Sequence, residues 1–240
     1  ATMLKAISSD NYLSFLAIKS LGLKNMLNFK KSAVIALLAV ASTSSFAQSA
    51  SGKTYFGLEL GSSKVDNATG ELTSSLVSSL GGSAAATQDS SIKLFKFLAG
   101  YKYSDNIDLE AAYLKSSDVN LTFSGTTRGS VAYAGAATQS ISGFEFSTNL
   151  RPDVATGWNN AFLKLGVHNF TADYSLRVTS GSASVATSSS DSGSGTLYGF
   201  GYDYPMGNGS NIRFAYTKYN KVAGGETSGS VIGLGFTKQF

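Results

Sequence analysis

Few side chains in this sequence belong to the types that most often carry out catalysis. The 240 residues include one histidine, His168 in the segment VHNFT, and no cysteine. A Ser–His–acid triad needs a histidine as general base, so such chemistry would depend on His168 alone. The lack of cysteine excludes disulfides and thiolate redox sites, and a single histidine disfavours a transition-metal site. We therefore predict no catalytic residue, no cofactor and no metal ion, and we interpret His168 as a buried polar residue.

The remaining chemistry lies in charged side chains inside segments of alternating polarity. Only 14% of the residues are charged, well below the usual share for a soluble domain. Several of these charges fall at similar distances from the short turns that join the segments. If the segments enclose a common interior, these side chains must pair, because buried charges need partners. The predicted interior charge network consists of Glu59, Lys96, Glu110, Glu145, Lys164 and Arg213.

The elements that would position these charges are strands. Alternation of apolar with small or polar residues, the signal of a half-buried strand, recurs in eight segments. They are residues 54–63, 91–104, 106–115, 140–150, 160–170, 196–204, 211–219 and 228–240.

The connections between the predicted strands alternate in length. Three are short, at 104–106, 151–159 and 204–210; four are longer and rich in Ser, Gly, Ala or Thr, at 66–90, 117–139, 177–195 and 220–229. We interpret 188–195 as a flexible low-complexity loop. This alternation is typical of transmembrane β-barrels, with short periplasmic turns and longer extracellular loops. The predicted fold is all-β, a single eight-stranded antiparallel up-and-down transmembrane β-barrel with both termini periplasmic.

The two faces of the predicted strands differ in polarity. Phe, Tyr, Leu and Ile occupy one face, whereas Gly, Ser and nearly all strand charges occupy the other. In a barrel surrounded by lipid, the apolar face points outward and the small and charged side chains fill the lumen. An interior of paired charges predicts a plugged barrel, although the many inward glycines leave a narrow water-filled path open as an alternative.

The N-terminal region has the three parts of a secretory signal peptide. Lys30 and Lys31 precede the apolar segment SAVIALLAVA, and Ser45-Phe46-Ala47 offers a cleavage site. We predict a signal peptide at 26–47, with an ordinary buried helix as the alternative, and a mature barrel at 48–240. Residues 1–25 carry no motif, and we interpret them as an upstream extension outside the mature protein.

The C-terminal strand would close the barrel against the first strand. Apolar side chains alternate there up to the last residue of the chain, at Ile232, Leu234, Phe236 and Phe240. Together with the signal peptide, GYKYSDNIDLEAAY (100–113) and YGFGYDYPMGNGSNIRFAY (198–216), this ending VIGLGFTKQF resembles the OmpA-like and OmpX-like small outer-membrane barrels of Gram-negative bacteria. The resemblance implies that these four residues form an assembly signal for the barrel-insertion machinery, with Lys238 departing from the pattern.

The resemblance also frames the function hypotheses. We expect a structural or surface-interaction barrel in the outer membrane, whose four longer loops contact extracellular proteins or glycans. A narrow channel or transporter is the alternative. A lipid A-modifying enzyme is disfavoured, because the deacylase family has a serine two residues after its histidine and Phe170 stands there. The net charge of +4 without a basic tract predicts no nucleic-acid partner.

Three lysines break the apolar pattern of the outward face. Each shares the register of an outward aromatic residue at the strand end next to a long loop. A lysine near the membrane interface costs only about 0–1 kcal/mol, and a phosphate partner would make it favourable. We therefore predict a lipopolysaccharide contact on the outer rim, with snorkelling to water as the alternative. The residues are Lys93, Lys115 and Lys218.

Overall fold

The computed structural model of the protein describes residues 52–66, 68–152, 158, 160–225 and 227–240. The predicted signal peptide and upstream extension lie outside these residues, as does most of the connection at 151–159. Within the described part, the chain forms ten strands, one α-helix and one short 3₁₀ helix.

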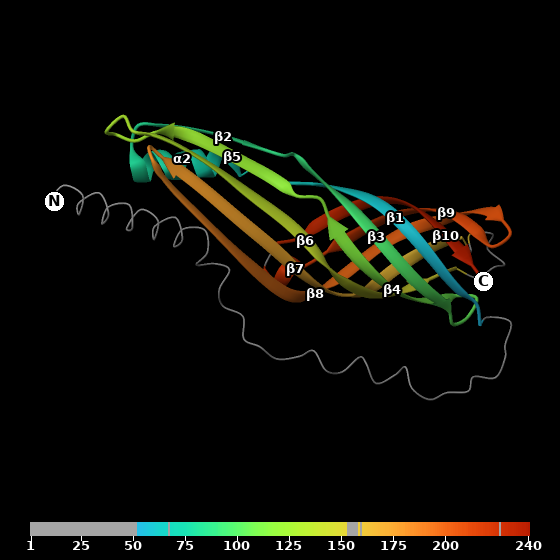
Figure 1. Ribbon diagram of the computed structural model, residues 1–240. Coiled ribbons are helices and arrows are strands. Elements are labelled where there is room, and N and C mark those ends of the chain that lie inside the picture. The colour runs from blue at the N-terminus through green and yellow to red at the C-terminus, as the bar shows by residue number, and fades with distance from the viewer. Residues whose placement is uncertain (1–51, 67, 153–157, 159, 226) are drawn as a thin grey trace.

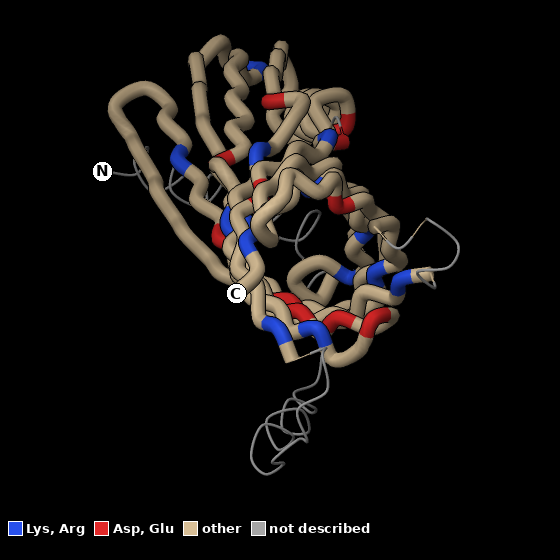
Figure 2. The backbone as a smooth tube through the Cα atoms, turned by 90° about the vertical axis from the view of Figure 1, so that its right-hand side faces the viewer, with Lys and Arg blue, Asp and Glu red and all other residues tan. Residues whose placement is uncertain are grey.

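Eight of the described strands form a closed antiparallel ring (Figures 1 and 2). Around the ring, neighbouring strands follow the order β6-β4-β3-β1-β10-β9-β8-β7, and the pairing of β7 with β6 closes it. The first and last strands pair over Tyr55–Ser62 and Ile232–Gln239, and the Phe240 amide donates to the Thr54 carbonyl at 2.9 Å. Closure leaves none of these strands with an open edge, which is the condition for a sheet to span lipid. The ring strands are β1 (Thr54–Lys64), β3 (Ser91–Lys102), β4 (Ile107–Ser116), β6 (Ala132–Leu150), β7 (Ala161–Ser180), β8 (Ala183–Gly207), β9 (Ser210–Tyr219) and β10 (Gly229–Gln239).

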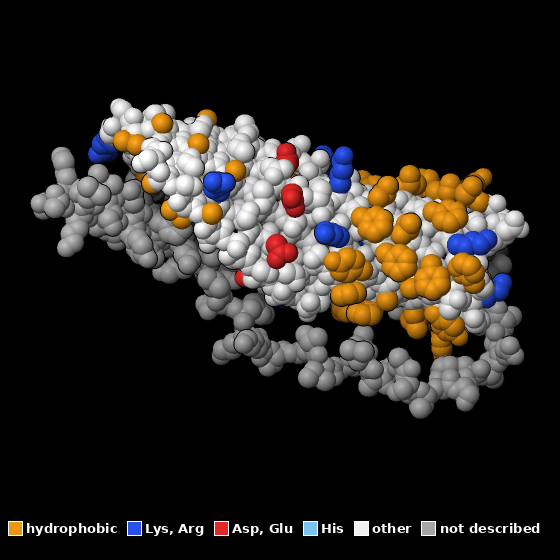
Figure 3. Space-filling view, in the orientation of Figure 1, with side chains coloured by type: hydrophobic (Ala, Val, Ile, Leu, Met, Phe, Trp, Pro, Cys, Tyr) orange, Lys and Arg blue, Asp and Glu red, His pale blue; other side chains and the backbone are white. Residues whose placement is uncertain are grey.

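The outside of the ring is apolar over one part of its length (Figure 3). Alternate positions of the ring strands expose large side chains, such as Leu60 at 67%, Phe200 at 59% and Ile232 at 70%. A continuous band of exposed large apolar side chains is not expected on a soluble monomer. The predicted alternation is confirmed on this face, which contacts lipid in a transmembrane barrel. The band ends where β6, β7 and β8 continue beyond it.

Three of the four longer connections are regular secondary structure rather than loops, and for these three the sequence-based prediction is wrong. The segment 66–90 contains α2 (Thr69–Leu80) and β2 (Ser83–Gln88), and 117–139 contains β5 (Val119–Thr126) and the first part of β6. Residues 188–195, interpreted as a flexible loop, belong to β8. No helix in the described part of the chain is long and apolar enough to cross a membrane.

These segments build a second layer beyond the apolar band, which we call the extension (left in Figure 1). It comprises α2, β2, β5, residues 132–139 of β6 and the β7–β8 hairpin 171–192, with sheet order β2-β5-β6-β7-β8. Cross-strand hydroxyl pairs accompany the backbone ladder, including Thr138–Ser175 at 2.6 Å and Thr171–Ser192 at 2.8 Å. A long hairpin satisfies its backbone groups locally, so a Ser- and Thr-rich composition here does not prevent strand formation. Only the 220–229 connection remains largely irregular, with the short η2 (Val222–Gly224).

The barrel changes into the extension at Gly143. Residues 142–150 of β6 pair with β4, whereas residues 132–139 pair with β5. Gly143 has φ +152°, and a Cβ atom there would lie 2.2 Å from the Asn169 carbonyl oxygen. Just beyond it, the Ile141 amide donates to the Ser116 hydroxyl at 2.8 Å and so replaces a ladder bond. Glycine is required because only it adopts this conformation without strain and without a clash.

Candidate functional site

The lumen of the ring contains a network of buried charges. Glu110 on β4 accepts from Lys164 Nζ on β7 at 2.5 Å and from Arg213 Nη1 on β9 at 2.5 Å. Three ring strands separate β4 from β9 in either direction, so the Glu110–Arg213 pair spans the full width of the barrel. All three side chains are buried.

The other predicted network residues join the same centre. Glu145 Oε1 lies 3.2 Å from Lys164 Nζ and 3.2 Å from Lys96 Nζ, and Lys96 Nζ is 3.3 Å from Glu59 Oε1. Two tyrosine hydroxyls donate to the acids, Tyr55 to Glu110 at 3.1 Å and Tyr219 to Glu145 at 2.7 Å. The structure therefore brings together all six charges that the sequence suggested. We call the six residues with Tyr55 and Tyr219 the lumenal charge network.

A second charged layer, which sequence reasoning missed, lies toward the end of the barrel that carries the short turns. Arg151, which directly follows β6, places Nε 2.7 Å from Asp108 and Nη2 2.6 Å from Asp203. Arg213 Nε lies 2.7 Å from Asp203 and so links this layer to Glu110. Asp108 and Asp203 occupy inward positions of their strands, so the alternation contained a signal for them. Arg151 continues the inward alternation of Glu145 and Asn149, but it stands one residue beyond the predicted strand and next to a proline, so the prediction assigned it to a short turn.

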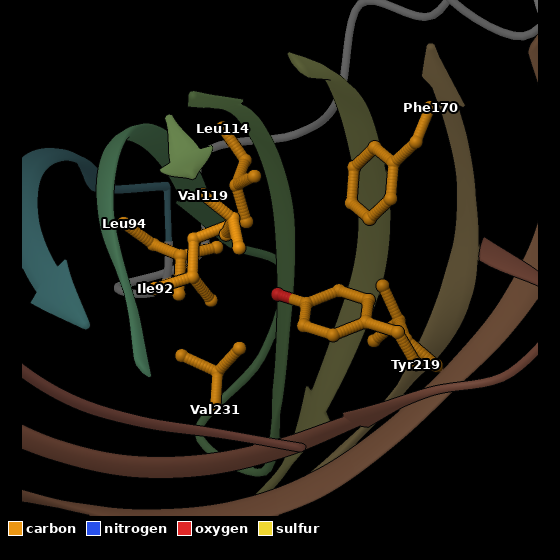
Figure 4. Close-up of a cluster of buried hydrophobic side chains, with 8 residues drawn as sticks. Ile92, Leu94, Leu114, Val119, Phe170, Tyr219 and Val231 are labelled. Atoms are coloured by element: carbon orange, nitrogen blue, oxygen red, sulfur yellow. The ribbon is translucent and has the colours of Figure 1, made fainter. Parts of the chain in front are cut away.

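Above the charge network, the lumen is filled by apolar side chains (Figure 4). This corrects the expectation that only small and charged residues point inward. Leu94 shares the inward register of Lys96, and Phe170 shares that of His168. The ring centroids of Phe170 and Tyr219 lie 5.3 Å apart. We call this cluster the apolar plug; it consists of Ile92, Leu94, Leu114, Val119, Phe170, Leu197, Tyr219 and Val231.

His168 lies at the border of these two layers. It is buried, its Nε2 is 2.9 Å from the Asn220 carbonyl oxygen, and its ring stacks on Phe170 at 4.3 Å. Within the described residues, no group of three or more His, Asp or Glu side chains is placed to hold a metal ion.

At several inward glycines, a large side chain from the adjacent strand fills the space, so these glycines do not open a water-filled path through the lumen. A Cβ at Gly100 would lie 2.0 Å from the Tyr55 ring, and one at Gly201 would lie 2.3 Å from the Phe162 ring. Each glycine makes room for a large side chain on the adjacent strand, so the space is occupied. A polar pocket of about 160 Å³ opens at the turn end, and its lining includes Arg151, Asp203 and Arg213.

The three outward lysines lie at the edge of the apolar band that faces the extension. Lys115 is exposed and stands opposite Phe95, and Lys93 is exposed on β3, the strand next to β4. Lys218 is half-buried on β9 opposite Ser230, with β10 and β1 between it and β3. Lys93 and Lys115 are thus neighbours in the sheet, and Lys218 stands apart.

The four predicted assembly-signal residues all point outward. Ile232, Leu234 and Phe236 expose at least 47% of their surface, and the Phe240 ring packs edge-on against Phe56 at 6.1 Å.

A closed antiparallel ring with an apolar outer belt and a buried, paired interior is the architecture of an integral transmembrane β-barrel protein. The sequence profile of the family described as "Outer membrane protein beta-barrel domain" matches residues 33–240. The chain belongs to this family, and its location is the bacterial outer membrane.

Solved structures of small outer-membrane barrels are similar to this chain. The attachment invasion locus protein Ail of Yersinia pestis is 11% identical over 79% of this chain and 99% of that chain, with a TM-score of 0.42. OprG of Pseudomonas aeruginosa is 13% identical over 79% and 96%, with a TM-score of 0.36. AlkL in lipid bilayers is 16% identical over 83% and 96%, also with a TM-score of 0.36. A comparison with curated proteins gave no match. At these identities and scores, the similarity carries no argument about activity.

Proposed function

We propose that this protein is a closed outer-membrane barrel that displays the extension at the cell surface to bind extracellular molecules. The observation that carries the proposal is the contrast between the two ends of the same strands. In the barrel, Arg213 and Glu110 bridge opposite walls below the apolar plug. Beyond the apolar band, β6, β7 and β8 continue into a structured layer rather than ending in short turns. A filled lumen does not allow solutes to diffuse through the barrel, whereas an ordered surface outside the membrane can bind other molecules.

The proposed topology places both termini in the periplasm and the extension outside. It rests on the short turns, which lie at the same end of the ring as Thr54 and Phe240. The chain has no cysteine, so a single introduced thiol is unique. A membrane-impermeant maleimide should label the Ser182→Cys variant on intact cells. It should label Asp105→Cys only after the outer membrane is disrupted. The reverse pattern would invert the topology.

Surface binding can be tested by shortening one hairpin without moving its register. Thr171 and Ser192 are cross-strand partners, so replacing 172–191 by Asn-Gly joins them through a two-residue turn. Cells that carry the full chain should adhere to immobilised glycans or matrix proteins, and cells that carry the shortened chain should lose this adhesion. Equal surface amounts, measured by labelling an epitope in both variants, serve as the control. Equal adhesion would refute the proposal.

We also propose that the protein is not an enzyme. The only histidine is enclosed between the apolar plug and the charge network, and its Nε2 is engaged by a backbone carbonyl. Expression in a host strain should leave the mass spectrum of its lipid A unchanged. A new deacylated or acylated species, absent from a His168→Gln variant, would show that this proposal is wrong.

A further inference from the structure

The extension contains a large apolar cavity between α2 and the sheet. Its volume is about 640 Å³, which lies in the range of small-molecule sites. Leu72, Leu76 and Leu80 of α2 line one side. The strands supply the other side, with Leu121 and Phe123 of β5, Leu176 and Val178 of β7, and Val185 of β8.

The helix is built to present leucine to this space. Leu72, Leu76 and Leu80 recur every four residues and so occupy one face. Leu76 is only 3% exposed, while the serines at 74, 75, 78 and 79 are exposed. Gly81 ends the helix with φ +67°, and its amide donates to the Val77 carbonyl at 2.9 Å. Exposing these leucines to water would be unfavourable, and the helix instead turns its apolar face toward the cavity.

Polar groups gather on part of the wall. Gln139 Nε2 donates to the Tyr174 hydroxyl at 3.4 Å, and Asp191 lines the cavity on the paired strand β8. Burial and the nearby Asp191 carboxylate both raise the pKa of Tyr174, which keeps its hydroxyl protonated as a donor. Asp191 is the only charged residue among the lining residues, so no cation there would hold an anionic ligand.

The apolar plug closes the side of the cavity that faces the membrane. Val119 belongs both to the cavity lining and to the apolar plug, so the plug forms part of the cavity boundary. A molecule in this space would therefore rest above a filled lumen. The arrangement suits retention of a ligand rather than passage through the barrel axis.

We propose that the cavity binds a single-chain amphipathic molecule with a neutral or cationic head group. The hydrocarbon chain lies against the α2 leucines, and the head group hydrogen-bonds with Gln139, Tyr174 or Asp191. This inference names a ligand class for the extension and rests on the proposed surface-binding function only for its biological setting. Binding to the purified protein does not depend on topology or adhesion, so the two proposals can fail separately.

The test uses the full chain in lipid nanodiscs with ¹³C-labelled Leu and Val methyl groups. Three probes share an eight-carbon chain: 1-octanol, octylamine and octanoate, of which the last two are cationic and anionic at pH 7.5. Octanol and octylamine should shift the methyl resonances of Leu76, Leu121 and Leu176 saturably. Octanoate should bind at least about tenfold more weakly. Leu98, which is buried in the barrel outside the apolar plug, provides an internal control signal that should not move.

Two substitutions on one strand provide a matched control. Ala137 lines the cavity opposite Leu121 and Leu176, whereas its neighbour Ala136 is exposed on the other face. Ala137→Trp should fill the space and weaken octanol binding at least about tenfold, and Ala136→Trp should not. If Ala137→Trp disturbs the barrel methyl signals, the smaller Ala137→Leu should still weaken binding. Asp191→Asn should weaken octylamine binding more than octanol binding.

Several outcomes would overturn the inference. These are shifts that do not saturate, equal shifts at the cavity and barrel methyl groups, or equal effects of the two tryptophan variants. Preference for octanoate would refute the assigned head-group class.

Discussion

Lys164→Met is the sharpest test of the lumenal charge network. Lys164 Nζ contacts Glu110 at 2.5 Å and Glu145 at 3.2 Å, and methionine has similar length without the charge. After the change, Glu110 still has Arg213 at 2.5 Å, and Glu145 still has Lys96 at 3.2 Å. Each of the two carboxylates therefore loses one cationic partner and keeps another.

The expected loss of stability follows from this geometry. Removing one partner of a buried ion pair costs about 3–5 kcal/mol, and the remaining cations favour the lower end, about 3 kcal/mol. That is a large share of the usual free energy of unfolding of about 5–15 kcal/mol. The barrel should stay shut, because the Arg213–Glu110 bridge does not include Lys164.

The assay is urea unfolding in lipid vesicles, followed by the fluorescence of Trp158, the only tryptophan in the chain. A double-mutant cycle adds Glu110→Gln alone and together with Lys164→Met. Because the two side chains touch, the double variant should lose less than the sum of the singles, by about 0.5–3 kcal/mol. Lys53→Met changes the same residue type at an exposed position and should stay within about 0.5 kcal/mol of the parent. Planar bilayers measure conductance in parallel.

The reasoning fails if Lys164→Met unfolds like the parent, or if the cycle is additive within about 0.3–0.5 kcal/mol. Either result would mean that these side chains do not share a buried site. A Lys164→Met barrel that conducts steadily would show that the bridge across the lumen does not close it.

Three other predictions concern the membrane rim, assembly and the connection between β2 and β3. Changing Lys93, Lys115 and Lys218 together to Gln should lower the amount of lipopolysaccharide that copurifies with the protein. It should also lower the protection that lipopolysaccharide gives the protein against heat unfolding. If both values stay at the parent level, these lysines only snorkel to water. Phe240→Ala should reduce the heat-modifiable, assembled fraction in cells, whereas Phe214→Ala, which removes another outward phenylalanine, should not; equal loss would refute a terminal signal. NMR titration should find a lowered pKa for Asp89, because the Asn120 backbone amide donates to it at 2.9 Å and the Asn120 side chain adds a second bond at 3.0 Å. A carboxyl with a lowered folded-state pKa stabilises the fold above its unfolded pKa and loses this contribution as pH falls through the folded value. Asn120→Ala removes only the side-chain bond and keeps the backbone amide, so most of the lowering of the Asp89 pKa should remain. An ordinary Asp89 pKa in the parent would contradict the hydrogen bonds from Asn120.

The alternation of side chains was sufficient to predict the membrane-spanning part. Period two is a local property of a strand, so Phe95 and Phe97 could be assigned outward and Lys96 inward without knowing any neighbour. Once the strands close, inward charges share a confined space and must pair. The same alternation puts Asp108 and Asp203 on the inward face, but the predicted network did not include them. Leu94 and Phe170 also have inward parity, but the prediction overlooked them because it assumed a polar lumen.

Composition misled the prediction of the extension. Leu72, Leu76 and Leu80 followed by Gly81 form a helix signature, but the intervening serines and threonine resemble a loop. The Ser-rich half of the β7–β8 hairpin has no apolar alternation, since neither face of it contacts lipid. Its strands are defined by backbone pairing, which sequence composition does not encode.

The sequence by itself determined which residues of each strand face lipid and which face the interior, because that choice depends on the two-residue repeat alone. It determined that the interior charges would need partners. Only the tertiary structure decided which partners meet. Arg213 reaches Glu110 because ring closure sets β9 opposite β4, and Arg151 reaches Asp108 and Asp203 because the turn end converges there. The cavity likewise exists only because α2 folds back onto strands that are distant in sequence, and the contacts of distant segments depend on the register and closure of the whole ring.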